Sequence, residues 1–103
     1  LIPFKAGMTI TNEPGIYVED KFGIRIENLL LTIEKEQNAF GKFLAFETLT
    51  LCPIDVRPID FSMLTAEEKA WLNNYHDSVR TALMPLLSDA ADQKWLEKAT
   101  EKI

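Results

Sequence analysis

Hydrophobic and polar residues follow two different periods along this chain, and the change falls near residue 58. In residues 1–58 the apolar positions form short runs separated by turn residues, which is typical of β-strands. In residues 59–103 they recur every three or four positions, which is typical of amphipathic helices. The sequence therefore predicts an α+β protein with a strand-rich half and a helical half.

Five segments of the first half have strand patterns. They are Met8–Asn12, Ile16–Val18, Gly23–Ile26, Asn28–Ile33 and Phe43–Leu51. The leucine-rich run at 28–33 is predicted to be buried on both faces, and the charged residues 34–42 to form a solvated hairpin connection. Pro14 and Gly15 predict a sharp turn with a positive φ at the glycine. Together these signals favour a short mixed or antiparallel sheet.

The second half predicts two helices. Thr65 and Glu68 have the spacing of a capping box and mark the start of the first helix. Pro85 is expected to kink or end it, because proline lacks the N–H that a helix interior needs. Ser88-Asp89 is expected to cap a second helix that extends to about residue 101. The apolar stripe of the first helix predicts that the helices pack against the sheet.

Composition narrows the class of protein. The 103 residues are 47% hydrophobic and 26% charged, as in an ordinary soluble globular protein. The net charge of −5 argues against nucleic-acid binding, which requires a basic face. The sequence contains no run of 18 apolar residues, so it predicts no membrane span. Because the chain opens on Leu1 and a turn, we expect it to be a piece of a longer polypeptide.

Several single residues are interpreted as structural. Cys52 is the only cysteine and lies among apolar residues, so it is predicted to be a buried thiol in a reducing, cytoplasmic compartment. A catalytic role for it would require a nearby base that the sequence does not indicate. His76 is predicted to be a surface or interface residue of the first helix. Trp71, Tyr75 and Trp95 have helical spacing and are predicted to be core or packing residues.

Two glutamates occur in unusual positions. Glu13 ends one apolar strand, and Glu27 follows Ile26 inside another. A buried carboxylate needs an ion pair, a hydrogen bond or a metal ion. Strand alternation could instead turn Glu27 to solvent, or pair it with Arg25 on the same face. If the turn at Pro14 brings the strands together, the carboxylates would converge and suit a divalent cation, although two ligands alone are too few.

Two segments that contain these glutamates, 6–17 and 22–28, resemble the last two metal-binding segments of the pita-bread metallopeptidases. That group includes Xaa-Pro aminopeptidases, prolidases and methionine aminopeptidases. Residues 46–55 and 71–76 resemble the C-terminal extension of the large, three-domain Xaa-Pro aminopeptidases. The likeness extends to about residue 99. It implies that the whole chain is the C-terminal part of a pita-bread catalytic domain, with a short mixed or antiparallel sheet packed by two C-terminal helices.

The resemblance also implies roles for single residues. Glu13 and Glu27 match two of the five ligands of a dinuclear metal centre, of which manganese is the expected metal and cobalt or zinc are alternatives. In the family, the residue at Glu13 binds one metal and is thought to shuttle protons, and the residue at Glu27 bridges both metals. Arg25 and Tyr17 match positions that orient these carboxylates. Tyr17 is equally compatible with an ordinary strand aromatic.

The family's remaining ligands, two aspartates and a histidine, lie upstream of the matching segment, and His76 corresponds to none of them. We therefore expect the parent protein to be a Xaa-Pro aminopeptidase, which removes the N-terminal residue from peptides that have proline second. We expect the isolated fragment to be inactive and to bind no metal. A prolidase, which cleaves dipeptides, and a non-catalytic binding or assembly module of the same fold are the alternatives. The expected partners are a proline-containing peptide and, through residues 60–103, a second copy in a homodimer.

Overall fold

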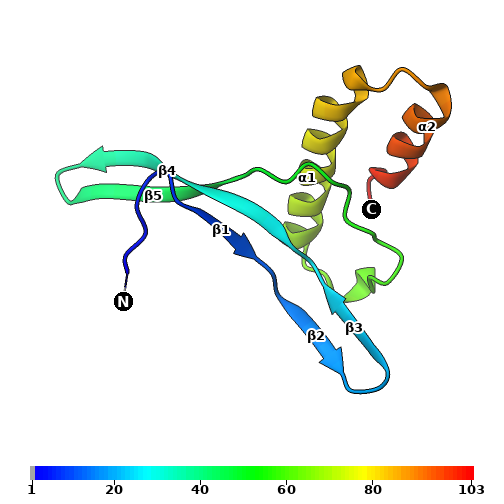
Figure 1. Ribbon diagram of the computed structural model, residues 1–103, viewed down its shortest axis with the longest axis horizontal. Coiled ribbons are helices and arrows are strands. Elements are labelled where there is room, and N and C mark those ends of the chain that lie inside the picture. Colours follow the sequence, from blue (N-terminus) through cyan, green and yellow to red (C-terminus); the bar gives the residue numbers. More distant parts are fainter. Residues whose placement is uncertain (1) are drawn as a thin grey trace. The chain divides into compact units, whose positions relative to one another are not determined.

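The structure is a computed structural model that describes residues 2–103. These residues form two compact units that meet between Thr50 and Leu51. The first unit contains strands and the second contains helices (Figure 1). The boundary lies before the change of sequence period because the extended segment that contains Cys52 and Ile54 makes hydrogen bonds to the first helix. Within the described part of the chain, no helix combines the length and apolar character needed to cross a membrane.

The first unit consists of antiparallel strands. They are β1 (Thr9–Asn12), β2 (Gly15–Val18), β3 (Phe22–Arg25), β4 (Asn28–Asn38) and β5 (Gly41–Thr48). β1 pairs with β4 and β2 pairs with β3 in one common register, with Thr9 opposite Leu31 and Val18 opposite Phe22. Residues 9–31 therefore form one long two-stranded ribbon, and β5 pairs with the other edge of β4. The antiparallel alternative of the predicted sheet is the one observed.

The prediction of a sharp turn at Pro14 and Gly15 is wrong. β1 runs on into β2 across these residues (Figure 1), and the φ of Gly15 is not positive. The ribbon turns instead at residues 19–21, where Asp20 has a φ of 56°. Pro14 interrupts the ladder because it has no N–H to donate. Its carbonyl still accepts the N–H of Ile26 at 3.2 Å, which keeps the two strands together.

The solvated hairpin predicted for residues 34–42 is present, but its connection is much shorter than predicted. β4 continues to Asn38 and β5 begins at Gly41, so that only two residues connect them. Gly41 has a φ of 133°, a conformation that favours glycine. Glu34 and Lys42 form an ion pair of 3.1 Å on this hairpin. Charged residues are compatible with these strands because their side chains face water.

β4 is not buried on both faces, as its leucine-rich pattern predicted. Its two buried residues are polar, Asn28 and Thr32, whereas Leu29 is exposed. The Leu29 backbone is bonded to the two residues that follow β5. Its N–H donates to Thr50 Oγ1 at 2.7 Å, and its carbonyl accepts the N–H of Leu49 at 2.8 Å. Much apolar surface of the strand unit is exposed, including Ile16, Tyr17, Phe22, Phe43 and Phe46.

The second unit contains two helices, α1 (Ala66–Leu83) and α2 (Ala90–Ala99). A 3₁₀ turn (Phe61–Met63) precedes α1, and a second one (Met84–Leu86) lies between the helices. The predicted capping box is confirmed, since Thr65 Oγ1 accepts the N–H of Glu68 at 3.2 Å and the Glu68 carboxylate accepts the N–H of Thr65 at 2.8 Å. Pro85 lies just after the end of α1, and Asp89 caps α2, both as predicted.

The core of the helical unit is formed by Tyr75, Val79 and Leu96, with Ile54 and Leu83 among the residues packed against it. Tyr75 is 8% exposed, which confirms its predicted packing role. Neither tryptophan lies in the core, because Trp71 is 54% and Trp95 is 62% exposed. Trp71 lies one turn before Tyr75 and stacks on its ring, with centroids 5.6 Å apart.

The predictions for His76 and Cys52 are both reversed. His76 is only 1% exposed, and its Nε2 accepts the N–H of Ile54 at 3.1 Å. Cys52 exposes its side chain, whereas its carbonyl accepts the Tyr75 hydroxyl at 2.8 Å. The physical reason is that residues 52–54 present their backbone, and not the Cys52 side chain, to the polar side chains of α1.

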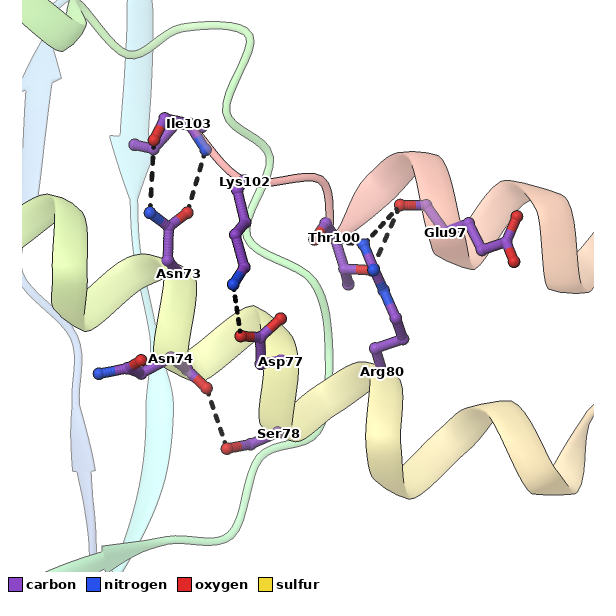
Figure 2. Close-up of polar contacts among 9 residues, drawn as sticks. All are labelled: Asn73, Asn74, Asp77, Ser78, Arg80, Glu97, Thr100, Lys102 and Ile103. Atoms are coloured by element: carbon purple, nitrogen blue, oxygen red, sulfur yellow. Dashed lines mark hydrogen bonds and ion pairs between the residues drawn. The ribbon is translucent and has the colours of Figure 1, made fainter.

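The end of the chain returns along α1 through polar contacts (Figure 2). Arg80 donates to Thr100 Oγ1 at 2.8 Å and to the carbonyls of Thr100 and Glu97 at 2.6 and 3.0 Å. These carbonyls lie at the C-terminus of α2, where a helix has no intrahelical donors left. The side-chain amide of Asn73 binds both the N–H and the carbonyl of Ile103, at 3.0 and 3.3 Å. Both residues therefore tie α1 to the segment that follows α2.

Candidate metal centre

Glu13 lies between β1 and β2, and Glu27 lies between β3 and β4, on opposite arms of the long ribbon. The register of both ladders, in which Asn12 faces Asn28 and Gly15 faces Arg25, places Glu13 directly across from Glu27. Like charges directly opposite each other destabilise an antiparallel pair. The two carboxylates therefore require a positive charge between or beside them.

Arg25 supplies a positive charge to both carboxylates. Its Nε lies 3.3 Å from Glu27 Oε2, and its Nη1 lies 3.8 Å from Glu13 Oε2. The three side chains are about half exposed, so the ion pairs are partly screened by water. Because one guanidinium reaches both carboxylates, Glu13 and Glu27 face the same side of the ribbon. The pairing of Glu27 with Arg25, one of the alternatives left open by the sequence, is present.

Tyr17 completes this group from β2. It faces Gly23 across the ribbon, and its ring also covers Gly15: a Cβ on Gly15 would lie 2.7 Å from the Tyr17 hydroxyl oxygen. The two glycines thus leave the space that the ring fills. Tyr17 is the largest cause that raises the pKa of Arg25 above its ordinary value, followed by the charges of Glu27 and Glu13. The Arg25 guanidinium therefore remains protonated in the folded protein.

Thr11 is a member of this group that the sequence interpretation did not single out. Its hydroxyl lies 2.6 Å from Glu13 Oε1 and donates a hydrogen bond to it. The available signal was the spacing of two, since residues i and i+2 of a strand share a face. Glu13 is thereby contacted through both of its oxygens, Oε1 by Thr11 and Oε2 by Arg25.

The two glutamates fit a divalent cation but do not complete a site for one. Carboxylate oxygens are the ligands that manganese and magnesium prefer, and two ionised carboxylates beside one guanidinium leave a net negative charge to be neutralised. Across residues 2–103, however, no three His, Cys, Asp or Glu side chains are grouped closely enough to hold a metal ion. His76 Nε2 accepts the Ile54 N–H, and His76 belongs to no such group among the described residues.

Comparison with known families agrees with this geometry. The model of the C-terminal region of peptidase M24 matches residues 42–103, and the model of metallopeptidase family M24 matches residues 2–34. The chain belongs to metallopeptidase family M24 and corresponds to its C-terminal region. The second match contains both Glu13 and Glu27.

Individual relatives with similar sequences are named as aminopeptidases P. The chain is 44% identical to aminopeptidase P1 of Lotus japonicus over 99% of its own length and 16% of that protein. It is 47% identical to a probable Xaa-Pro aminopeptidase P of Coprinopsis cinerea over 96% of its length and 17% of that protein. The chain thus spans about one sixth of the length of these relatives.

A solved structure shares the fold. It is the X-prolyl aminopeptidase from Caenorhabditis elegans, described as a cytosolic enzyme with a di-nuclear active site. It matches with a TM-score of 0.82 and 37% identity, over 97% of this chain and 17% of that one. The predicted fold class is therefore confirmed: the chain is α+β and forms part of a pita-bread fold.

Proposed function

We propose that this chain is the C-terminal part of a dinuclear-metal Xaa-Pro aminopeptidase, and that Glu13 and Glu27 are two of its metal ligands. The observation that carries the proposal is the placement of both carboxylates opposite each other, beside one guanidinium. The names of the relatives support the aminopeptidase over a prolidase. A substrate with proline as its second residue follows from those names.

The chemistry follows from the residues that this chain supplies. When bound, two divalent ions would activate a water molecule and polarise the scissile carbonyl of the peptide. Glu13 and Glu27 would hold the ions through their carboxylate oxygens. Arg25 would limit the repulsion between the two carboxylates, and Tyr17 would favour the charged form of the guanidinium. Glu13, bonded by Thr11 through Oε1, would also be the group that moves a proton during hydrolysis.

The remaining parts of the proposal concern the whole protein. Manganese is the metal proposed, with cobalt or zinc as alternatives, because a mixed set of carboxylate and histidine ligands accepts each of them. A cytoplasmic location is supported by the description of the Caenorhabditis elegans relative as cytosolic. We propose a proline-containing peptide as substrate and a homodimer as the assembled state.

The test is Glu27→Gln in the full-length aminopeptidase that carries this chain. The change keeps the shape of the side chain and removes its charge, so we expect manganese affinity and kcat on a Xaa-Pro peptide to fall by more than about 100-fold, beyond the effect of losing an outer-shell partner. Glu19→Gln is the matched control, since Glu19 is an exposed carboxylate in the turn of the same ribbon. Equal metal affinity and kcat in the two variants would contradict the proposal.

A further inference from the structure

We propose that Thr11 is a positioning residue of the metal centre, which fixes the Glu13 carboxylate through a hydrogen bond from its hydroxyl. This inference rests on the proposed function, because it concerns a ligand of the proposed metal ions. It adds a residue to which the family resemblance assigned no role. The hydrogen bond joins Thr11 Oγ1 to Glu13 Oε1 within one arm of the ribbon.

The geometry of the hydrogen bond is that of a strong interaction. The separation of 2.6 Å between Thr11 Oγ1 and Glu13 Oε1 lies within the range of hydroxyl hydrogen bonds to an ionised carboxylate. Thr11 is β-branched and lies in β1, so its χ1 is restricted and its hydroxyl has few alternative directions. A stiff donor thus holds a long side chain that otherwise rotates freely in water.

The second contact of Glu13 explains why such a donor is needed. Arg25 Nη1 lies 3.8 Å from Glu13 Oε2, while the same guanidinium lies closer to Glu27, at 3.3 Å. Without Thr11, Glu13 would be free to turn both oxygens toward Arg25, as carboxylates do in bidentate pairs. The Thr11 hydroxyl keeps Oε1 away from the guanidinium. This arrangement fixes the orientation of the Glu13 carboxylate.

The chain offers a matched control in Thr9. Thr9 and Thr11 lie on the same strand, two residues apart, so they share a face. Each threonine is opposite a leucine of β4, Leu31 for Thr9 and Leu29 for Thr11. Both threonines are exposed. The Thr9 hydroxyl makes no hydrogen bond to another described residue. Replacing either threonine by valine keeps the side-chain shape and the β-branching, and only Thr11→Val removes a bond to Glu13.

The experiment measures manganese binding by calorimetry in the full-length aminopeptidase. We expect Thr11→Val to weaken the manganese Kd about 10-fold, in the range found for partners that orient metal ligands. Thr11→Ser, which keeps the hydroxyl, should restore most of the affinity, and Thr9→Val should equal the wild type. Thr11→Val should also lower kcat on a Xaa-Pro peptide when manganese is limiting. This loss should become smaller when manganese is saturating. Thermal unfolding of the metal-free proteins checks that the two valine variants are folded alike.

The outcomes separate this inference from the proposed function. If Thr11→Val binds manganese as tightly as Thr9→Val while Glu27→Gln loses it, the metal centre exists and the role of Thr11 is wrong. If Glu27→Gln also retains manganese, the metal centre itself is wrong. If Thr11→Ser is as weak as Thr11→Val, a hydroxyl at position 11 does not restore manganese binding, and the inference is equally overturned.

Discussion

The ring of Tyr17 lies over Gly23, its partner across the β2–β3 ribbon. A Cβ added to Gly23 would lie 2.8 Å from Tyr17 Cδ1, closer than carbon atoms normally approach. The glycine is needed for this ring, because neither a turn nor a positive φ occurs at this position. Tyr17 also raises the pKa of Arg25, the residue that reaches both glutamates.

Gly23→Ala should therefore displace the Tyr17 ring. We expect it to lower the free energy of unfolding by about 1 kcal/mol, the low end of the cost of overpacking, because the exposed ring can move aside. The double variant Gly23→Ala with Tyr17→Ala should cost less than the sum of the single changes, because the clash is then absent. Urea unfolding of the four proteins measures the difference. Additive costs would show that the ring does not require the glycine.

Arg80→Ala should destabilise the helical unit. The change removes three hydrogen bonds and leaves the carbonyl of Thr100, a residue with no exposed surface, without this donor. Loss of a partner for a buried carbonyl costs about 1–3 kcal/mol. Urea unfolding followed by circular dichroism at the helical band measures it.

Arg57→Ala is the matched control for that measurement. Arg57 is also paired, with Asp55 at 2.6 Å, but its side chain is 88% exposed. An ion pair in water contributes little to stability, so this variant should unfold at nearly the same urea concentration as the wild type. Equal stability of the Arg80 and Arg57 variants would contradict the role given to Arg80.

His76 should make the helical unit less stable in mild acid. Burial lowers the pKa of His76 below its ordinary value of 6.5, and the charge of Arg80 lowers it further. The hydrogen bond from the Ile54 N–H to Nε2 also requires that nitrogen to be unprotonated. Well above pH 6.5 neither the folded nor the unfolded state binds a proton there, so the full stability is present. As the pH falls below 6.5, the unfolded state binds a proton first, and stability is lost until the pH reaches the folded pKa.

Measurement of this effect is simplified because the chain has one histidine. Urea unfolding at several pH values should show a lower midpoint at pH 5.5 than at 7.5, a window centred on about the ordinary histidine pKa. His76→Gln should reduce the dependence. A histidine ring signal that titrates at or above its ordinary pKa in the folded protein would contradict the interpretation.

The isolated 103-residue chain should show no hydrolysis of a Xaa-Pro peptide when manganese is added. Glu13 and Glu27 are two carboxylates, and no third ligand joins them within residues 2–103. A divalent cation prefers about six ligands, so we expect only weak manganese binding. The full-length protein, assayed in the same buffer, is the positive control. Clear turnover by the isolated chain would show that the site needs no residues from outside it.

The sequence predicted the parts of this fold that depend on neighbouring residues. The capping box at Thr65, the end of α1 at Pro85 and the cap at Asp89 were correct, because each is decided by atoms within one turn of helix. The strands around Glu13 and Glu27 were also placed correctly. That the two carboxylates converge was predicted, but for the wrong reason, since the chain continues straight through Pro14.

Only the tertiary structure decided how these elements meet. The position of Glu13 opposite Glu27 depends on the register of a ribbon that turns at residues 19–21, and a shift of one residue would place them apart. Whether His76, Trp71 and Trp95 are buried depends on which face of their helix packs against other residues. The segment after Leu51 covers His76, because the Ile54 N–H donates to it. A hydrophobic pattern records how apolar a residue is, whereas burial also depends on which distant residues pack against it. For that reason the sequence by itself determined the strands, the helix ends and the family motifs, and the structure determined the neighbours of each side chain.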